Sequence, residues 1–155
     1  MMRAQPWKLC LLIGSLTALV GCGGGFEYGV VEGKLLVEGS PVDKIQVEFF
    51  PTKEGPRSMG VTDAEGRFSL TTDDGKPGAV VGTHKIVLRD VGIMGAKFMG
   101  RAAEDVDMTE GRTPRITNDY VDPTKTPLQK EVTAGKSVIS LEAKAPPKQS
   151  GGKAK

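Results

Sequence analysis

Residues 60–70 read Gly-Val-Thr-Asp-Ala-Glu-Gly-Arg-Phe-Ser-Leu, and this stretch decides the fold class. Its centre has turn composition, because Asp63 can accept hydrogen bonds from nearby backbone amides and Gly66 takes a positive φ at no steric cost. Phe68 and Leu70 then alternate with polar residues, which places both side chains on one face of a strand. The stretch predicts a β-hairpin whose strands face a core.

The period-two alternation continues on both sides of this hairpin. Seven short segments carry apolar side chains in one phase and are separated by turn residues. They are residues 31–37, 45–49, 59–61, 68–70, 84–89, 128–132 and 137–142, with Met59 and Val61 in phase in the third. About seven strands suffice for two packed sheets. We therefore expect an all-β fold, an antiparallel β-sandwich of about seven strands.

The start of the chain has the three parts of a bacterial secretion signal in order. Two basic residues come first, residues 9–20 are apolar, and a small residue precedes Cys22. So short an apolar run cannot span a bilayer, which needs roughly 20 residues of helix. Residues 19–22, Leu-Val-Gly-Cys, resemble the lipobox at which a lipoprotein precursor is cleaved and acylated. We expect residues 1–21 to be a lipoprotein signal peptide, with an uncleaved anchor or an ordinary secretory signal as the alternatives.

The lipobox resemblance implies a lipid anchor at Cys22. This cysteine would carry a diacylglyceryl thioether and an N-acyl chain of the palmitate type. Two or more acyl chains hold a protein stably in a membrane, whereas a single chain does not. We expect a membrane-anchored lipoprotein of the bacterial cell envelope that faces the periplasm or the cell exterior.

Composition divides the rest of the chain into three parts. Residues 22–28 form a glycine-rich tether, residues 29–142 have the length of one ordinary domain, and residues 143–155 are rich in Lys, Pro and Gly. The last part predicts a disordered tail.

Charge bears on the possible partners, and cysteine content bears on disulfides. The chain has 21 Lys and Arg against 19 Asp and Glu, and Arg3 and Lys8 would leave with the signal peptide. The folded part is thus nearly neutral and has no basic cluster, so no nucleic-acid partner is expected. Cys10 lies in the apolar run and Cys22 would be acylated, so the mature domain keeps no thiol or disulfide.

Five segments within residues 29–142 resemble one known family. They are Val-Glu-Gly-Lys-Leu at 31–35, Gly-Ser-Pro-Val at 39–42, Val-Glu-Phe-Phe-Pro at 47–51, the hairpin at 60–70 and Gly-Thr-His-Lys-Ile at 82–86. The family is the carboxypeptidase regulatory-like, transthyretin-like β-sandwich, which has an immunoglobulin-like architecture. The resemblance implies an accessory domain without a reaction of its own, a type that also occurs alone in short bacterial lipoproteins. The family often has an aromatic residue where this chain has His84.

His84 is the single histidine of the chain. It lies in phase with Ile86 and Leu88, which favours a strand-end side chain over a catalyst. A histidine-based nucleophilic triad would have to use a Ser or Thr that no motif marks. The sequence contains no G-x-S-x-G, H-E-x-x-H or phosphate-binding glycine loop. We predict no catalytic residue and no cofactor, so the chain is not expected to be an enzyme.

Two groups of side chains have the chemistry of metal ligands. The acidic group consists of Asp63, Glu65, Asp73 and Asp74. It lacks the ligand ladder of an EF-hand loop, and turn chemistry explains its members without calcium. The group that offers soft ligands to Cu(I) consists of Met94, Met99 and Met108 with His84. Methionines fill gaps in any core, so no metal site is predicted.

Residues 91–119 are longer than a sandwich connection requires. Loops of this length are uncommon unless they are functional or disordered. Glycines alternate here with apolar side chains, so the segment is either a contact surface or a mobile insertion with a few side chains packed on the sandwich. If the domain has a binding site, we expect it here first.

These observations favour a non-enzymatic, lipid-anchored module of the cell envelope with an interaction or structural role. Its partner would be a protein or an envelope polymer, contacted through a sheet edge or through residues 91–119. The alternative is an envelope lipoprotein that binds a small ligand or a glycan. A hydrolase whose site carries no recognisable motif is the third possibility.

The substitution Cys22→Ala tests the expected anchor. Because the acyl chains would be attached to this sulfur and to its amino group, the variant should lose labelling by a fatty-acid probe and leave the membrane fraction. Metabolic labelling followed by fractionation measures both effects. Continued labelling would rule out the lipobox.

Overall fold

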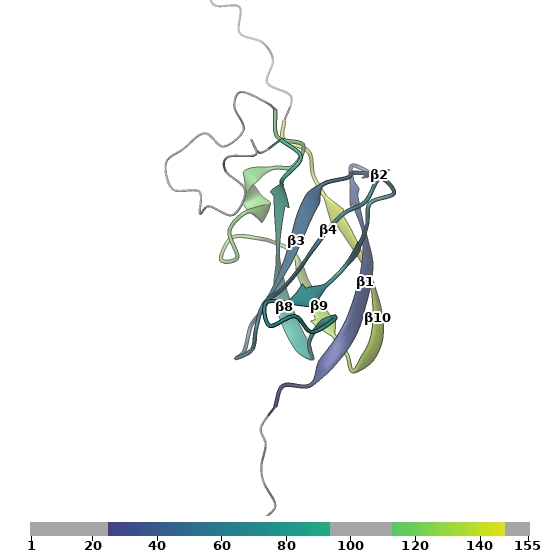
Figure 1. Cartoon of the computed structure of the whole chain (residues 1–155). Helices are drawn as coiled ribbons and strands as arrows, with labels where there is room; N and C mark the ends of the chain where they lie inside the picture. The colour runs from purple at the N-terminus through teal and green to yellow at the C-terminus, as the bar shows by residue number, and fades with distance from the viewer. Residues whose placement is uncertain (1–24, 94–112, 148–155) are drawn as a thin grey trace, which may run out of the picture.

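The computed structural model describes residues 25–93 and 113–147, which form an all-β fold of two packed sheets (Figure 1). The strands are β1 (Tyr28–Val37), β2 (Ser40–Pro41), β3 (Ile45–Pro51), β4 (Ser58–Val61), β5 (Arg67–Ser69), β6 (Thr71–Thr72), β7 (Ala79–Val80), β8 (Gly82–Asp90), β9 (Gln129–Val132) and β10 (Gly135–Ala143), with one 3-10 turn, η2 (Asn118–Tyr120). In this part of the chain, no helix is long and apolar enough to cross a membrane.

Strand β1 organises the first sheet, which we call sheet A. It pairs with β10 along one side, and its other side pairs in turn with β7, β5 and β2. The second sheet, sheet B, has the order β6-β4-β3-β8-β9. All ladders are antiparallel except that between β1 and β10.

The core lies between the two sheets and confirms most of the expected phases. Side chains buried from sheet A are Val31, Leu35, Val37, Phe68, Ala79, Ile139, Leu141 and Ala143. Those buried from sheet B include Ile45, Val47, Phe49, Ile86, Leu88 and Val132. Gly33 belongs to the inward phase of β1, and it is glycine because a Cβ there would collide with the Phe68 ring.

The expected hairpin at residues 60–70 forms only in part. The turn is as predicted: Asp63 Oδ1 accepts the amides of Glu65 and Arg67, and Gly66 has φ +73°. The returning arm is divided, however, because β5 pairs with β1 in sheet A and β6 pairs with β4 in sheet B. The hairpin therefore links the two sheets rather than lying within one.

The phase of β4 differs from the apolar pattern of its sequence. Ser58 is buried, whereas Val61 is 52% exposed and Met59 is half-buried. The reason is the close approach of the two hairpin arms, because a Cβ at Gly60 would collide with the backbone oxygen of Ser69. Only glycine fits the inward position there, and the apolar neighbours take the outward phase.

One ladder departs from the expected antiparallel arrangement. The chain leaves β9 in sheet B, crosses to sheet A and adds β10 to the open side of β1, parallel to it, with Gly29 opposite Gly135 and Val37 opposite Ala143. Besides the seven expected strands, the two-residue segments β2, β6 and β7 also pair. Ala143 is 2% exposed, so the ordered domain extends beyond the expected boundary at residue 142.

Because β1 and β10 are parallel, both strands begin at one end of the domain and both finish at the other (Figure 1). The described chain starts at the end where β1 begins, and β8 and β10 both finish at the opposite end. A strand of this length separates the two ends by roughly 30 Å. Of residues 1–24, which contain the expected signal peptide and Cys22, the structure describes none.

Two glycine substitutions, one in the turn at residues 63–66 and one outside it, test how tightly that turn is packed. Gly39 and Gly66 both have positive φ, but a Cβ at Gly66 would lie 2.5 Å from the Leu35 carbonyl oxygen, whereas a Cβ at Gly39 would meet nothing. We expect Gly39→Ala to cost about 1 kcal/mol of unfolding free energy and Gly66→Ala to cost about 2 kcal/mol or more. Urea denaturation measures both, and equal losses would contradict the observed packing of the turn.

Candidate functional site

Strand β10 forms one edge of sheet A and lies beside β1 at the margin of the molecule (Figure 1). Among residues 25–93 and 113–147, it pairs with no strand except β1. Its outward side chains are Lys136, Val138, Ser140 and Glu142, all exposed, with Val138 at 80%. A long edge strand with an exposed apolar side chain is a template for pairing with another chain.

The backbone direction of each β10 residue follows from the bonds at its end. The Ala143 carbonyl accepts the Glu38 amide on the β1 side. The Lys144 carbonyl accepts the Thr117 amide, and the Lys144 amide donates to Tyr120 Oη, on the opposite side. Because successive residues of a strand point their backbone groups to opposite sides, the even-numbered residues 136–142 direct theirs to the free edge.

Residues 113–128 limit this free edge at its far end. Ile116 and Tyr120 are buried and close the core between β8 and β10. The Thr126 hydroxyl donates to the Ile86 carbonyl at 2.6 Å and continues the edge of β8 beyond β9. The last part of the expected insertion at 91–119 thus belongs to the fold, whereas residues 94–112 lie outside the described residues.

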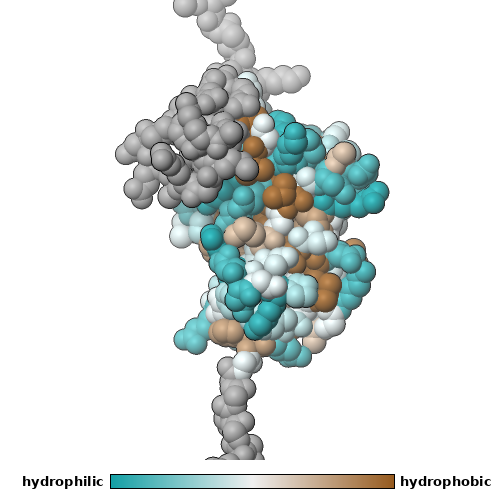
Figure 2. All heavy atoms as spheres, in the orientation of Figure 1, coloured by the Kyte–Doolittle hydropathy of each residue, from teal (hydrophilic) through white to brown (hydrophobic). Residues whose placement is uncertain are grey.

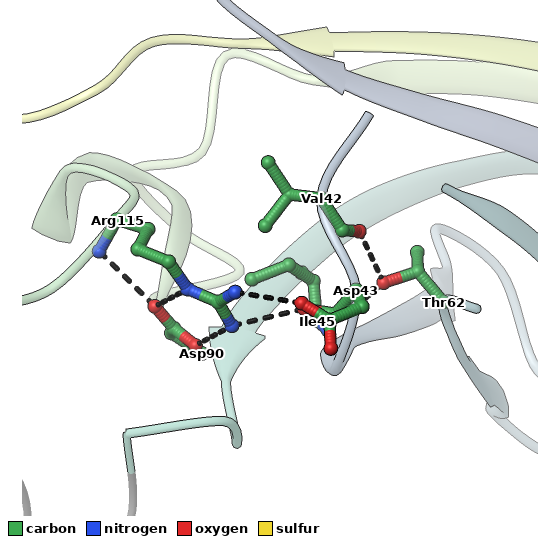
Figure 3. A network of polar contacts seen from close by, with 6 residues as sticks. All are labelled: Val42, Asp43, Ile45, Thr62, Asp90 and Arg115. Carbon is green, nitrogen blue, oxygen red and sulfur yellow. Dashed lines mark hydrogen bonds and ion pairs between the residues drawn. The ribbon is translucent and has the colours of Figure 1, made fainter. Parts of the chain in front are cut away.

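Arg115 holds this segment in place (Figure 3). Its guanidinium donates from Nε to Asp90 Oδ2 at 2.9 Å and from Nη2 to Asp90 Oδ1 at 2.6 Å. Nη1 donates to Asp43 Oδ1 and Nη2 to the Asp43 carbonyl, both at 2.9 Å. We call these three residues the Arg115 clamp. It joins the end of β8, the loop before β3 and the start of residues 113–128.

The chain around the clamp is shaped to admit the guanidinium. A Cβ at Gly92 would collide with Arg115 Nη2, so glycine leaves the space that the side chain fills. The Gly92 amide also donates to the Lys44 carbonyl. The Thr62 hydroxyl donates to the Val42 carbonyl and accepts the Ile45 amide, which fixes the loop that carries Asp43 (Figure 3).

The charges of the clamp stabilise one another. The Asp90 side chain is 4% exposed, and the guanidinium together with the Arg115 amide satisfies its carboxylate. Hydrogen bonds to Asp90 raise the pKa of Arg115, and the hydrogen bond from Arg115 lowers the pKa of Asp43. Paired bonds from one guanidinium to one carboxylate are among the stronger polar contacts in proteins. Their role here is to hold three distant segments of the chain together.

A groove of about 650 Å³ lies on the outer face of sheet A beside the free edge. Lys34 of β1 lies directly opposite Arg67 of β5, and neither has an ion-pair partner among the described residues. Hydroxyls of Ser69 and Ser140 and the side chain of Val138 also line the groove. Glu32 and Asp63 line the groove as well, but Glu32 is paired with Lys136 and Asp63 accepts backbone amides of its turn. The polar lining is therefore mixed in charge and suits a hydroxyl-rich ligand or one that carries an anionic group.

A second buried polar cluster lies on the outer face of sheet B. Glu48 is 2% exposed, and its Oε1 accepts Arg89 Nε and Gln46 Nε2, both at 2.8 Å. Arg57 Nη1 lies 3.5 Å from Glu48 Oε2, and Arg57 Nε donates to Asp73. The cluster ties β3 and β8 to the residue before β4 and the residue after β6 on the solvent side of the sheet.

Figure 2 shows the surface of one face of the molecule. Hydrophilic side chains predominate on its described part, and apolar ones lie in small separate groups. A contact surface on this face would depend on polar and backbone groups more than on a continuous apolar patch.

His84 lies in the core with 0% exposure, in phase with Ile86 and Leu88 as expected. Its Nδ1 lies 3.0 Å from the Gly82 carbonyl, which can only accept, so Nδ1 carries the proton. Nε2 is then unprotonated, and it has no hydrogen-bond partner in the described structure. Burial lowers the pKa of His84. A fully buried imidazole packed against Phe49 cannot meet a substrate from solvent.

The acidic residues of the turns have partners within the chain. Asp63 caps its turn, Asp73 accepts Arg57 Nε at 2.8 Å, and Asp74 lies 3.2 Å from Lys76 Nζ. In the ranges 25–93 and 113–147, no three His, Cys, Asp or Glu side chains are grouped to hold a metal ion. Met94, Met99, Met108 and Cys22 lie outside the described residues, so the predictions made for them remain predictions.

Sequence reasoning missed both polar clusters. Arg115 is separated from Asp43 by 72 residues, and Glu48 from Arg89 by 41. No spacing rule links residues so far apart. Glu48 gave no signal either, because it takes the outward, polar phase of the alternating segment 45–49, where a charged residue is ordinary.

No protein-family model, curated protein or solved structure matches the chain.

The clamp predicts a large loss of stability on removal of its guanidinium. Arg115→Ala leaves the Asp90 carboxylate buried without its partner. A broken buried ion pair costs about 3–5 kcal/mol, and the one-third exposure of Arg115 reduces this to about 2 kcal/mol. Adding Asp90→Asn should recover part of the loss, because the unpaired charge is then gone.

Lys125→Ala is the matched control for this prediction. Lys125 Nζ lies 3.5 Å from Asp122 Oδ2, but the lysine side chain is 77% exposed. The substitution should change the unfolding free energy by less than about 0.5 kcal/mol. If urea denaturation showed similar losses of unfolding free energy for Arg115→Ala and Lys125→Ala, the clamp would not stabilise the fold.

His84 predicts a specific pH dependence of stability. Its folded pKa lies below its ordinary value of 6.5, so the unfolded chain binds a proton that the folded chain resists. Stability should therefore fall as the pH drops below about 6.5, and His84→Phe should remove this slope between pH 7 and pH 5. Melting temperatures across this range measure it. The same slope in both proteins would place the titration elsewhere.

Proposed function

We propose that this chain is a non-enzymatic, lipid-anchored module of the bacterial cell envelope that binds a protein partner along the free edge of β10. The observation that carries this proposal is the nine-residue edge strand, whose alternate backbone groups face away from the domain. Extended segments bind such edges by adding a strand, in which main-chain hydrogen bonds supply affinity and outward side chains supply selectivity.

Two features limit where a partner strand can pair. The Lys144 backbone is already bonded to Thr117 and Tyr120, so the open part of the edge ends before it. The Arg115 clamp fixes the chain that makes these bonds. Residues 136–142 are thus left as a defined docking edge.

The proposed anchor fits the course of the chain. Cys22 precedes β1 by a short glycine-rich stretch, so acyl chains on its sulfur would attach the domain by the end at which β1 begins. The edge of β10 runs alongside β1 from this end to the other. We also propose that the two-sheet fold is the carboxypeptidase regulatory-like, transthyretin-like sandwich suggested by its segments, which would make it an accessory domain.

Photo-crosslinking in intact cells tests the proposed contact. A photoreactive residue replacing Val138 should capture a partner, because this side chain is 80% exposed on the docking edge. The matched control replaces Glu54, an exposed residue of the loop between β3 and β4. A product specific to position 138, identified by mass spectrometry, is the expected result. Equal products at both positions, or none, would contradict the proposal.

A second candidate function is the binding of a small anionic ligand or a glycan. The groove on the outer face of sheet A favours it, because Lys34 and Arg67 lie opposite each other there without an ion-pair partner among the described residues. The acidic residues of the lining, Glu32 and Asp63, are already bonded to Lys136 and to turn amides. Calorimetric titration with acidic oligosaccharides should then show binding that Lys34→Ala and Arg67→Ala each weaken. Unchanged heats for both variants would exclude this use of the groove.

A further inference from the structure

The outward side chains of β10 form a self-complementary series. From Lys136 to Glu142 the strand reads Lys-Ser-Val-Ile-Ser-Leu-Glu, with a positive charge at one end, a negative charge at the other and Ile139 at the centre. Lys136 and Glu142 share the exposed face with Val138 and Ser140. A strand of this kind matches itself when it is turned end to end.

We propose that β10 pairs with β10 of a second copy of this chain, antiparallel and across a twofold axis at Ile139. The proposal rests on the proposed function, since it assigns the occupant of the same docking edge. In this register, Lys136 lies opposite Glu142 of the second copy, and Val138 lies opposite Ser140 of the second copy. Each pair occurs twice, so two opposite-charge pairs flank the centre of the new ladder.

The backbone allows this register. Residues 136, 138, 140 and 142 direct their amide and carbonyl groups to the free edge, and the register places each of them opposite another member of the set. These are the pairs that exchange both backbone hydrogen bonds in an antiparallel ladder. Ile139, whose backbone faces β1, meets its own counterpart at a position without hydrogen bonds.

Neighbouring registers are less favourable. A twofold axis at Ser140 would place Lys136 opposite Lys144 of the second copy, which sets like charges together and uses a backbone already bonded to Tyr120. An axis at Val138 would leave Glu142 opposite an alanine. Only the axis at Ile139 pairs opposite charges at both ends, and register in a sheet is decided by such side-chain matches.

The pairing would also cover the most exposed apolar side chain of the strand. Val138 is 80% exposed in the single chain. In the proposed register it lies diagonal to Val138 of the second copy, at a separation that neighbouring side chains on a sheet can bridge. Lys136 already contacts Glu32 at 2.9 Å, so in the pair it would lie between two carboxylates.

The arrangement is compatible with two anchors in one membrane. Because the two β10 strands run in opposite directions, the two β1 strands begin roughly 25 Å apart along the ladder. Each tether from Cys22 to Tyr28 can span up to about 20 Å when extended. Both acylated cysteines could therefore reach a membrane that lies along the paired strands.

Charge reversal in the full chain tests the proposal. Two copies with different epitope tags are expressed together and purified from detergent-solubilised membranes, and self-association is measured by copurification. Lys136→Glu and Glu142→Lys should each weaken association about tenfold, because each turns two attractive pairs into repulsive ones. The double variant with both reversals restores opposite charges, and it should return association to within about threefold of the parent.

Disulfide trapping gives a second measurement that does not depend on charge. One tagged copy carries Val138→Cys and the other carries Ser140→Cys, and we expect a disulfide between the copies because residues facing each other in a ladder have suitable Cα separations. The control combines Val138→Cys with Lys136→Cys, because the register places residue 136 of the second copy four positions from the residue that faces Val138. The unsubstituted chain controls for its own Cys10 and Cys22.

The outcomes separate this inference from the proposed function. Copies that do not associate overturn self-pairing, and so does association that ignores both charge reversals. Crosslinking from position 138 to another protein without self-association overturns self-pairing and leaves the docking edge in place. No product from position 138 and no association would remove both proposals.

Discussion

The parallel ladder between β1 and β10 is the constraint on which the rest of the structure depends. It joins the first and last strands of the domain over nine paired positions, and it places Leu35 and Leu141 side by side in the core. One side of β1 pairs with β10, and the other side pairs with three short strands from different parts of the chain, β2, β5 and β7. The same ladder makes β10 an edge strand and gives the domain two unlike ends. The proposed docking edge depends on it, and so does the end of the domain at which the proposed anchor would attach.

Two buried carboxylates, Asp90 and Glu48, hold segments that lie outside the β1–β10 ladder. Residues 113–128 pack against β8 and β10, and this segment would have little to hold its start without the guanidinium of Arg115. Removing a carboxylate as buried as that of Asp90 from water is costly, so the folded chain can hold it there only when its oxygens are paired. Glu48 is paired less completely across sheet B, because Oε1 accepts two hydrogen bonds while Oε2 has only the Arg57 guanidinium at 3.5 Å. In each case a polar contact fixes a position that the apolar core does not reach.

Much of the fold could be predicted from the sequence because period-two alternation reports directly on burial. The inward phases of β1, β3 and β8 were predicted correctly, as were the approximate position of β10 and the turn that ends at Gly66. Alternation does not report which strands pair, so the parallel partner of β1 and the division of the hairpin arm between two sheets were not predicted. The phase of β4 was misread because Gly60 contributes no side chain to the pattern. The Arg115 clamp had no sequence signal, since its members come from three distant segments.

The measurement that tests this account most directly is the pattern of nuclear Overhauser effects between β1 and β10 in isotopically labelled protein. We expect amide and Hα contacts that link residues 29–37 to residues 135–143 at one constant sequence offset, without the close Hα pairs of antiparallel strands. Contacts at a constant sum of residue numbers would show an antiparallel ladder instead. An absence of contacts between the two segments would show that β10 is not the edge of sheet A, and the docking edge would be lost with it.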